Sequence, residues 1–177
     1  MRLAGLAALA FTGYRVAVAV AKRRTLRTAE RVDLERYLGT WYEVARLPAF
    51  FERGCVGITA TYSQAPDGHI RVVNRCSRGS CSGKHAEIEG SARVVDAATN
   101  ARLKVHFRGP FGGDYWILDV GSSYDYALVG TPSRKRLWIL SRTPVMDESL
   151  FERLVEEARD LGFPTAKLIR APVCASP

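Results

Sequence analysis

Histidine is scarce in this sequence, and its scarcity narrows the kinds of site that the chain can build. The 177 residues contain three histidines, His69, His85 and His106, which are dispersed along the chain. Their positions match neither a Ser/His/Asp grouping nor a metal-binding spacing. We therefore predict no catalytic residues, no metal site and no cofactor, and we expect that the protein is not an enzyme.

Signatures of nucleic-acid binding are also missing. The net charge is +8, which would attract an anionic partner. Apart from Lys22-Arg23-Arg24, however, the basic residues are scattered, and no zinc-finger or RNA-recognition signature accompanies them. We expect a solvated basic surface and no nucleic-acid partner. Peripheral contact with a membrane through anionic lipid headgroups stays open.

The first 21 residues differ from the rest of the chain. Met1-Arg2 is followed by an apolar run, so residues 1–21 predict a cleaved signal peptide or a retained membrane anchor. The basic residues directly after the run favour the anchor. We favour export to the periplasm or outer membrane because of the cysteines described next. The leader has no cysteine that could carry a lipid. Residues 22–32 are interpreted as a linker and residues 33–177 as one domain.

Cysteine is limited to four positions, Cys55, Cys76, Cys81 and Cys174. An even number in an exported chain predicts two disulfides. Cys76 and Cys81 bracket a turn-forming stretch, so their pairing would close a small loop, and Cys55 would then pair with Cys174. Four reduced thiols in a cytoplasmic protein are the alternative. A zinc site is not expected, because the spacing is not Cys-x-x-Cys.

From Trp41 onward, β-type segments alternate with turn signals at short intervals. Strands are expected at residues 41–47, 55–63, 69–75, 86–95, 102–108, 114–120, 124–130 and 136–142. The period then changes, which predicts a helix over 148–161 capped by Asp147, and a short strand over 165–170. The links are short and contain no helical crossover. The predicted fold is all-β, an eight-stranded antiparallel up-and-down barrel with one C-terminal helix packed outside.

Six motifs carry a family resemblance. They are Tyr37-Leu38-Gly39-Thr40-Trp41-Tyr42-Glu43, Phe51-Glu52-Arg53-Gly54, Ala60-Thr61-Tyr62-Ser63, Gly109-Pro110-Phe111, Tyr124-Asp125-Tyr126-Ala127-Leu128-Val129, and Leu137-Trp138-Ile139-Leu140-Ser141-Arg142-Thr143-Pro144. In them the chain resembles the lipocalins, specifically the bacterial outer-membrane lipocalin group related to apolipoprotein D. The resemblance implies a barrel that binds a fatty acid, lysophospholipid or similar ligand and carries or stores it for maintenance of the cell envelope.

The resemblance also implies structural roles at one end of the barrel. It places Gly39, Trp41, Asp125 and Arg142 at a closed base, where the guanidinium of Arg142 packs across the indole of Trp41. It supports a bridge between Cys55 and Cys174, and it allows a homodimer, which related bacterial lipocalins form.

Candidate ligand contacts follow from strand alternation and from the barrel ends. Trp138, Leu140 and Arg142 alternate along one strand, so their side chains lie on the same face, and Trp138 should point inward. The resemblance also places a cavity-lining tryptophan at this position. The other candidates are Leu47, Phe50, Phe51, Tyr62, Phe107, Phe111, Tyr115 and Trp116. Tyr115 and Trp116 must face opposite sides of their strand. At the mouth, Arg53 or Arg108 would meet a phosphate or carboxylate of the ligand.

Two other functions stay open. Residues 1–21 could remain in the membrane and make the barrel an anchored interaction module. A thiol enzyme on the same fold would use Cys55 or Cys76 as a reduced nucleophile. Titration of free thiols in the native protein distinguishes the enzyme from the container.

Overall fold

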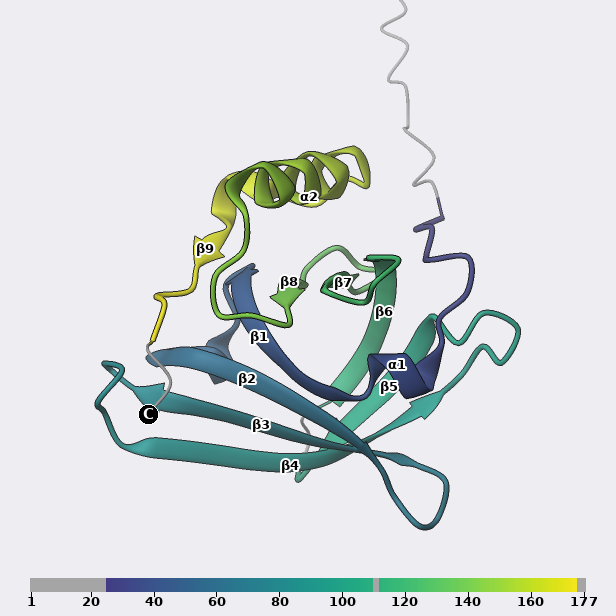
Figure 1. The fold of residues 1–177 in the computed structure, drawn as a ribbon, viewed down its shortest axis with the longest axis horizontal. Coiled ribbons are helices and arrows are strands. Elements are labelled where there is room, and N and C mark those ends of the chain that lie inside the picture. The colour runs from purple at the N-terminus through teal and green to yellow at the C-terminus, as the bar shows by residue number, and fades with distance from the viewer. Residues whose placement is uncertain (1–24, 110–111, 175–177) are drawn as a thin grey trace, which may run out of the picture.

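A closed antiparallel barrel dominates the computed structural model, which describes residues 25–109 and 112–174 (Figure 1). Its strands are β1 Gly39–Arg46, β2 Cys55–Gln64, β3 Ile70–Arg78, β4 His85–Val94, β5 Arg102–Phe107, β6 Gly112–Val120, β7 Tyr126–Gly130, β8 Leu137–Ser141 and β9 Ile169–Arg170. They follow one another in the order β2-β3-β4-β5-β6-β7-β8-β1-β9, and β1 also pairs with β2, which closes the ring. The predicted eight-stranded up-and-down barrel is confirmed.

Short helices connect and flank the strands. They are α1 Leu34–Tyr37, the 3₁₀ turn η1 Phe50–Glu52, α2 Glu148–Asp160 and the 3₁₀ turn η2 Thr165–Lys167. Asp147 begins α2 as predicted, since its carboxylate accepts a hydrogen bond from the backbone N–H of Leu150 at 3.1 Å. The extra strand is shorter than predicted because the first residues of that stretch form η2.

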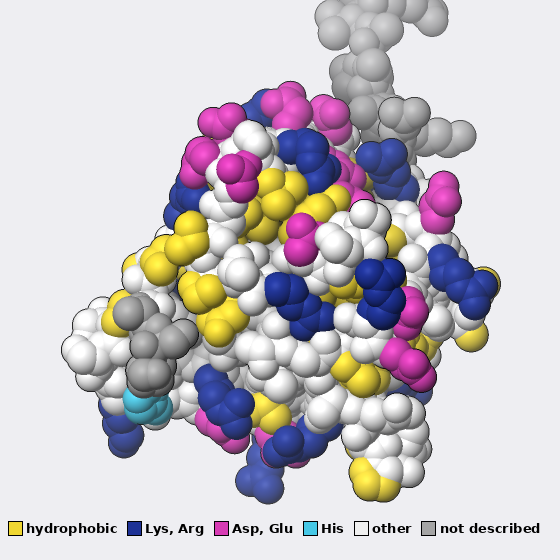
Figure 2. All heavy atoms as spheres, in the orientation of Figure 1, with side chains coloured by type: hydrophobic (Ala, Val, Ile, Leu, Met, Phe, Trp, Pro, Cys, Tyr) yellow, Lys and Arg dark blue, Asp and Glu magenta, His cyan; other side chains and the backbone are white. Residues whose placement is uncertain are grey.

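Helix α2 lies on the outside of the barrel, as predicted (Figure 1). Its buried face consists of Phe151, Leu154 and Ala158, which pack on outward side chains of the wall such as Leu128 and Ile139. Figure 2 shows acidic side chains gathered on the opposite, exposed face of this helix. The helix therefore buries its apolar stripe against the barrel. No helix within the two described ranges is long and apolar enough to cross a membrane.

The segment before α1 also contacts the barrel. Leu26 and Val32 are buried, and the N–H of Ala29 donates to the carbonyl of Ile117 at 3.0 Å. The N–H of Val32 donates to the carbonyl of Thr99 at 2.7 Å. The described part of the segment interpreted as a linker is therefore packed on the domain. The leader, residues 1–21, lies outside the described residues.

Trp41 and Arg142 lie together at the closed base of the barrel. Trp41 is fully buried, and its indole N–H donates to the carbonyl of Tyr37 at 2.9 Å. The guanidinium carbon of Arg142 lies 3.8 Å from the centre of the indole ring. The same guanidinium donates to the carbonyls of Arg36, Leu38 and Thr40 at 2.7, 2.8 and 3.0 Å. One side chain thus covers the indole and binds the end of α1 to the start of β1.

Two further residues, Gly39 and Asp125, contact Arg142 and fix its position. Gly39 has a positive φ of 93°, and a Cβ there would lie 3.2 Å from the Arg142 guanidinium, so the site favours glycine. The carbonyl of Asp125 accepts the backbone N–H of Arg142 at 2.8 Å, and its carboxylate accepts the hydroxyl of Ser123. Gly39, Trp41, Asp125 and Arg142 therefore share one end of the barrel.

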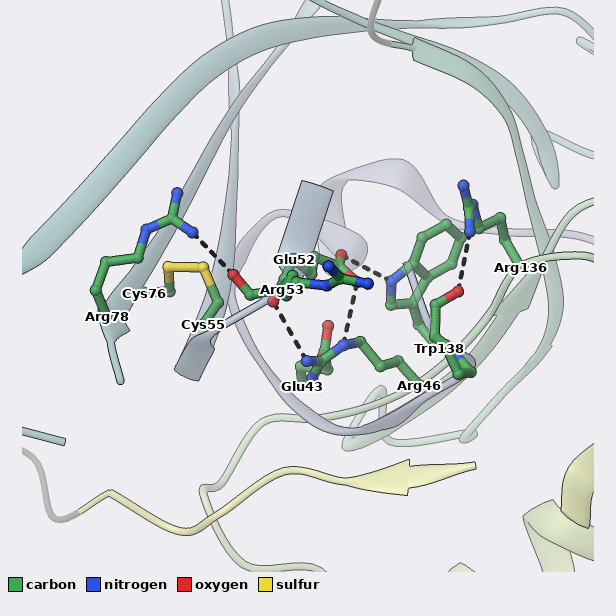
Figure 3. Close-up of polar contacts among 10 residues, drawn as sticks. Glu43, Arg46, Glu52, Arg53, Cys55, Cys76, Arg78, Arg136 and Trp138 are labelled. Carbon is green, nitrogen blue, oxygen red and sulfur yellow. Dashed lines mark hydrogen bonds and ion pairs between the residues drawn. A yellow bond between two sulfur atoms is a disulfide. The ribbon is translucent and has the colours of Figure 1, made fainter. Parts of the chain in front are cut away.

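The disulfides differ from the expected pairs and require a correction. The structure joins Cys55 to Cys76 and Cys81 to Cys174, with Cα separations of 5.5 and 5.3 Å, instead of Cys55 to Cys174 and Cys76 to Cys81. Figure 3 shows the bond between Cys55 and Cys76. The reason is the length of β3, which continues to Arg78 and keeps Cys76 in the strand. Cys76 therefore faces the interior beside Cys55, while Cys81 lies in the following turn and meets the C-terminal tail.

Replacing Arg142 tests how much the base depends on it. Arg142→Ala should lower the free energy of unfolding by about 3 kcal/mol, since a hydrogen bond to a charged group contributes roughly 1.5–3 kcal/mol. Urea denaturation measures this change. Arg93→Ala, on the exposed face of β4, is the control and should lie close to wild type. Equal stability of the two variants would contradict the role of Arg142.

The disulfide pairing is tested by peptide mapping. Proteolysis without reduction should yield linked peptides that contain Cys55 with Cys76 and Cys81 with Cys174. Mass spectrometry before and after reduction identifies them. A linked pair of Cys55 with Cys174 would instead support the connectivity expected from the sequence.

Candidate functional site

A cavity of about 630 Å³ occupies the barrel interior above the base. Its wall follows the alternation of the strands: Ile58, Ala60 and Tyr62 on β2, and Val72, Asn74 and Cys76 on β3. The remaining strands contribute Glu43, Ala86, Ile88, Val105, Phe107, Tyr115, Trp138 and Leu140. The volume falls within the range of about 300–1,000 Å³ typical of small-molecule sites. The barrel is therefore hollow and lined mainly by apolar side chains.

Six of the nine predicted ligand contacts line this cavity, namely Phe50, Phe51, Tyr62, Phe107, Tyr115 and Trp138. Leu47 does not, because it packs in the cluster between the outer wall and α2. Trp116 also lies on the outer wall, where the guanidinium of Arg102 is 4.6 Å from its ring centre. Phe111 lies outside the described residues.

Tyrosines form the floor of the cavity. The hydroxyl of Tyr115 is 2.8 Å from that of Tyr37 and 2.9 Å from that of Tyr62. Burial raises the pKa of all three phenols, that of Tyr62 to about 12, so they stay neutral. Their hydroxyls bind one another. The rings of Tyr62 and Tyr115 line the cavity, and the ring centre of Tyr115 lies 6.4 Å from that of Trp138.

A cluster of buried charges lies beside this apolar surface (Figure 3). Arg46 donates to the carboxylate of Glu43 at 2.7 Å, and its Nε is 3.3 Å from Oε2 of Glu52. The indole N–H of Trp138 donates to Oε1 of Glu52 at 3.2 Å. The side chains of Glu43, Arg46 and Glu52 are 3%, 9% and 12% exposed. Two carboxyl groups thus share one buried guanidinium.

The burial of this cluster changes its titration. Burial and, to a lesser extent, the nearby Glu52 raise the pKa of Glu43, Arg46 opposes both effects, and the resulting pKa is about 8. The pKa of Glu52 is also raised by burial, against the hydrogen bond from Trp138 and the charges of Arg46 and Arg136. Glu43 is therefore protonated in the folded protein near neutral pH.

Arginines lie at the mouth. Arg75, Arg78 and Arg136 line it, whereas Arg53 and Arg108, which the sequence favoured for this role, are not among the lining residues. Arg75 is paired with Glu87 at 2.7 Å. The guanidinium of Arg136 lies 5.1 Å from the ring centre of Phe51 and donates to the carbonyl of Pro48 at 3.0 Å. The mouth thus combines exposed aromatic rings with positive charge.

The sequence contains a signal for part of this charged cluster, in the alternation of β1. Glu43 is two residues after Trp41 in the same strand, so its side chain points to the same, inward face. The register of β1 against β8 shifts between Glu43 and Ala45, so a bulge at Val44 reverses the alternation afterwards. Ala45 and Leu47 therefore pack toward α2 together with Val44, while Arg46 meets Glu43. The position of Glu52, which lies on a loop, had no comparable signal.

The fold and the hollow interior define a ligand-binding barrel, and comparison with known proteins places it in a family. The family model described as Lipocalin-like domain matches residues 32–173. Temperature-induced lipocalin-1 of Arabidopsis thaliana is 39% identical over 165 residues, which cover 88% of this chain and 87% of the relative. Outer membrane lipoprotein Blc of Vibrio cholerae is 42% identical over 138 residues, 77% of this chain and 80% of the relative.

A solved structure supports the same fold. Insecticyanin from the tobacco hornworm Manduca sexta superposes with a TM-score of 0.67 at 20% identity, covering 84% of this chain and 87% of that one. The chain belongs to the lipocalin family. Relatives of both the outer-membrane and apolipoprotein D kinds match, so the predicted resemblance is confirmed. Lipocalins bind small hydrophobic ligands and are generally binding proteins rather than enzymes.

The buried position of Glu43 predicts a pH-dependent stability. In the unfolded chain Glu43 ionises near its ordinary pKa of 4.5, whereas in the folded protein it keeps its proton up to about pH 8. Its stabilising contribution is therefore lost as the pH rises from about 4.5 to 8. The glutamine introduced by Glu43→Gln would stay neutral at every pH. The free energy of unfolding of Glu43→Gln, measured relative to wild type, should therefore increase between pH 5 and pH 8.

Urea denaturation at several pH values measures this difference. Glu89→Gln is the matched control, since Glu89 is exposed and paired with Arg71, which lowers its pKa. Its difference from wild type should stay constant over the same pH range. Parallel pH profiles for wild type and Glu43→Gln would show that Glu43 does not titrate abnormally.

Proposed function

We propose that the barrel binds one fatty acid, lysophospholipid or similar amphiphile and carries or stores it for maintenance of the cell envelope. The observation that carries the proposal is the cavity of about 630 Å³ with its apolar wall and floor. Each methylene group buried there would contribute about 0.8 kcal/mol. The translational, rotational and conformational entropy that the ligand loses on binding offsets part of this favourable free energy.

The mouth fits the polar end of such a ligand. Arg78 and Arg136 line it, and either guanidinium can bind a phosphate or carboxylate with two hydrogen bonds. Phe50 is 68% exposed and Phe51 is 45% exposed beside them. Aromatic rings next to arginines suit transient contact with an anionic membrane, from which the ligand would enter.

An exported location accompanies this function. Two disulfides are typical of proteins in oxidising compartments, which favours the periplasm or the outer membrane. One relative is named an outer membrane lipoprotein, which supports the same location for this chain. A homodimer also belongs to the proposal, by analogy with related bacterial lipocalins. The anchored-module alternative depends on residues 1–21, which lie outside the described part of the chain.

The thiol-enzyme alternative loses its nucleophile. It requires a reduced Cys55 or Cys76, and these two residues are joined to each other in the structure. A disulfide lacks the thiolate that such catalysis uses. Binding is therefore the function that the geometry supports best.

A blocked cavity tests the proposal. Ala86 lines the cavity, whereas Ser91 lies on the exposed side of the same strand. In Ala86→Trp the indole should fill the interior and weaken binding of a fluorescent fatty acid by at least about ten-fold, equivalent to losing roughly two buried methylenes. Ser91→Trp should bind like wild type.

The measurement uses delipidated protein and a titration of the probe, with thermal denaturation as a check of folding. Saturable binding with a stoichiometry of one supports a container. Failure of the wild type to bind, or equal binding by Ala86→Trp and Ser91→Trp, would overturn the proposed site.

A further inference from the structure

The cavity wall has more carboxyl groups than cationic groups at one place. Glu43 and Glu52 contribute two carboxyl groups, and Arg46 contributes the one guanidinium that contacts both. All three side chains are almost completely buried. If both carboxyl groups were ionised, the cluster would carry one uncompensated negative charge, which is costly in an apolar interior.

Acceptor atoms in the same cavity also lack hydrogen-bond partners. Oε2 of Glu52 and Nε of Arg46 face each other at 3.3 Å without hydrogen-bond geometry, so that this acceptor and this donor both lack a hydrogen-bond partner, and Oδ1 of Asn74 is buried without any partner within the described residues. Glu43, Glu52 and Asn74 all line the cavity. Buried polar groups are normally satisfied, so these oxygens point to a ligand that donates hydrogen bonds.

A cationic ligand group would allow both carboxyl groups to be ionised, which specifies the ligand further. We propose that Glu43 and Glu52 form a subsite for the protonated amine of an amine-bearing amphiphile; this rests on the proposed function, because the ligand's chain would occupy the same cavity. An ammonium group is a compact cation with donors only, which complements carboxylate and amide oxygens. The arginines at the mouth would hold any anionic group of the ligand farther out, and so orient it.

Protonation should control this subsite. The charged and titratable groups around it are Arg46 of β1, Tyr62 of β2, Arg75 and Arg78 of β3, Glu87 of β4, Asp114 and Tyr115 of β6, and Arg136 before β8. Burial raises the pKa of the two buried phenols, Tyr62 and Tyr115, so they stay neutral. Glu43 holds a proton up to about pH 8, and burial raises the pKa of Glu52 as well, so a bound ammonium would displace the proton of Glu43.

The test compares three ligands with the same chain: dodecylamine, dodecanol and dodecanoate. At pH 8.5 dodecylamine should bind delipidated protein at least about ten-fold more tightly than dodecanol, as expected for a charge-assisted hydrogen bond. This preference should shrink at pH 6, where a proton occupies Glu43. Isothermal titration calorimetry in two buffers of different ionisation enthalpy should detect proton release on amine binding near pH 7.5.

Two variants connect the preference to the carboxyl groups. In Glu43→Gln the ratio of the dodecanol and dodecylamine dissociation constants should fall to within about two-fold of one, because the amide cannot supply the charge. The proton release should disappear with it. Glu89→Gln, on the outer face of β4, should keep the wild-type ratio and the wild-type proton release.

The outcomes separate the subsite from the container. If none of the three ligands binds, the proposed function itself fails. If dodecanol binds but dodecylamine binds no more tightly at pH 8.5, or dodecanoate binds most tightly, the barrel is a container and the amine subsite is overturned. A preference that survives in Glu43→Gln overturns it as well.

Discussion

The rest of the structure depends on the contact between Arg142 and the base of the barrel. A helix as short as α1 leaves its last carbonyl groups without partners in the helix. Arg142 satisfies those of Arg36 and Leu38, and then that of Thr40 in β1. Its planar guanidinium also covers the buried Trp41. Because Arg142 follows β8, this one side chain joins the last strand of the barrel to the first and closes the floor.

Because the floor is closed, the alternation of the strands decides which side chains line the interior of the barrel. With one end sealed by Trp41 and the tyrosines, every inward side chain contributes to one enclosed space. Eight strands leave room for about one small ligand. The bulge at Val44 modifies this arrangement at a single point, since it turns Ala45 and Leu47 toward α2 and lets Arg46 meet Glu43. The charged cluster is therefore a product of strand register.

Strand alternation and turn residues are local features, which is why the barrel, the outer helix and most inward aromatic residues could be predicted from the sequence. What could not be predicted depended on longer-range geometry. The disulfide pairs differ from the prediction because β3 continues through Cys76 to Arg78. The sequence predicts Leu47 as a ligand contact, because nothing local reveals the bulge that turns it outward. Glu52 was missed because the direction of a loop side chain depends on its partners.

The charged cluster opposes the stability of the barrel. Well-packed apolar residues in place of a buried ion pair are often neutral or stabilising, so a container selected for stability alone would have an apolar wall here. Strongly perturbed carboxyl groups in a cavity are typical of functional sites. Glu52 also extends from η1, whose neighbouring Phe50 and Phe51 are exposed at the mouth. A ligand that contacts Glu52 would therefore affect the loop through which it enters, so that recognition of the head group and closure of the mouth would depend on the same carboxyl group.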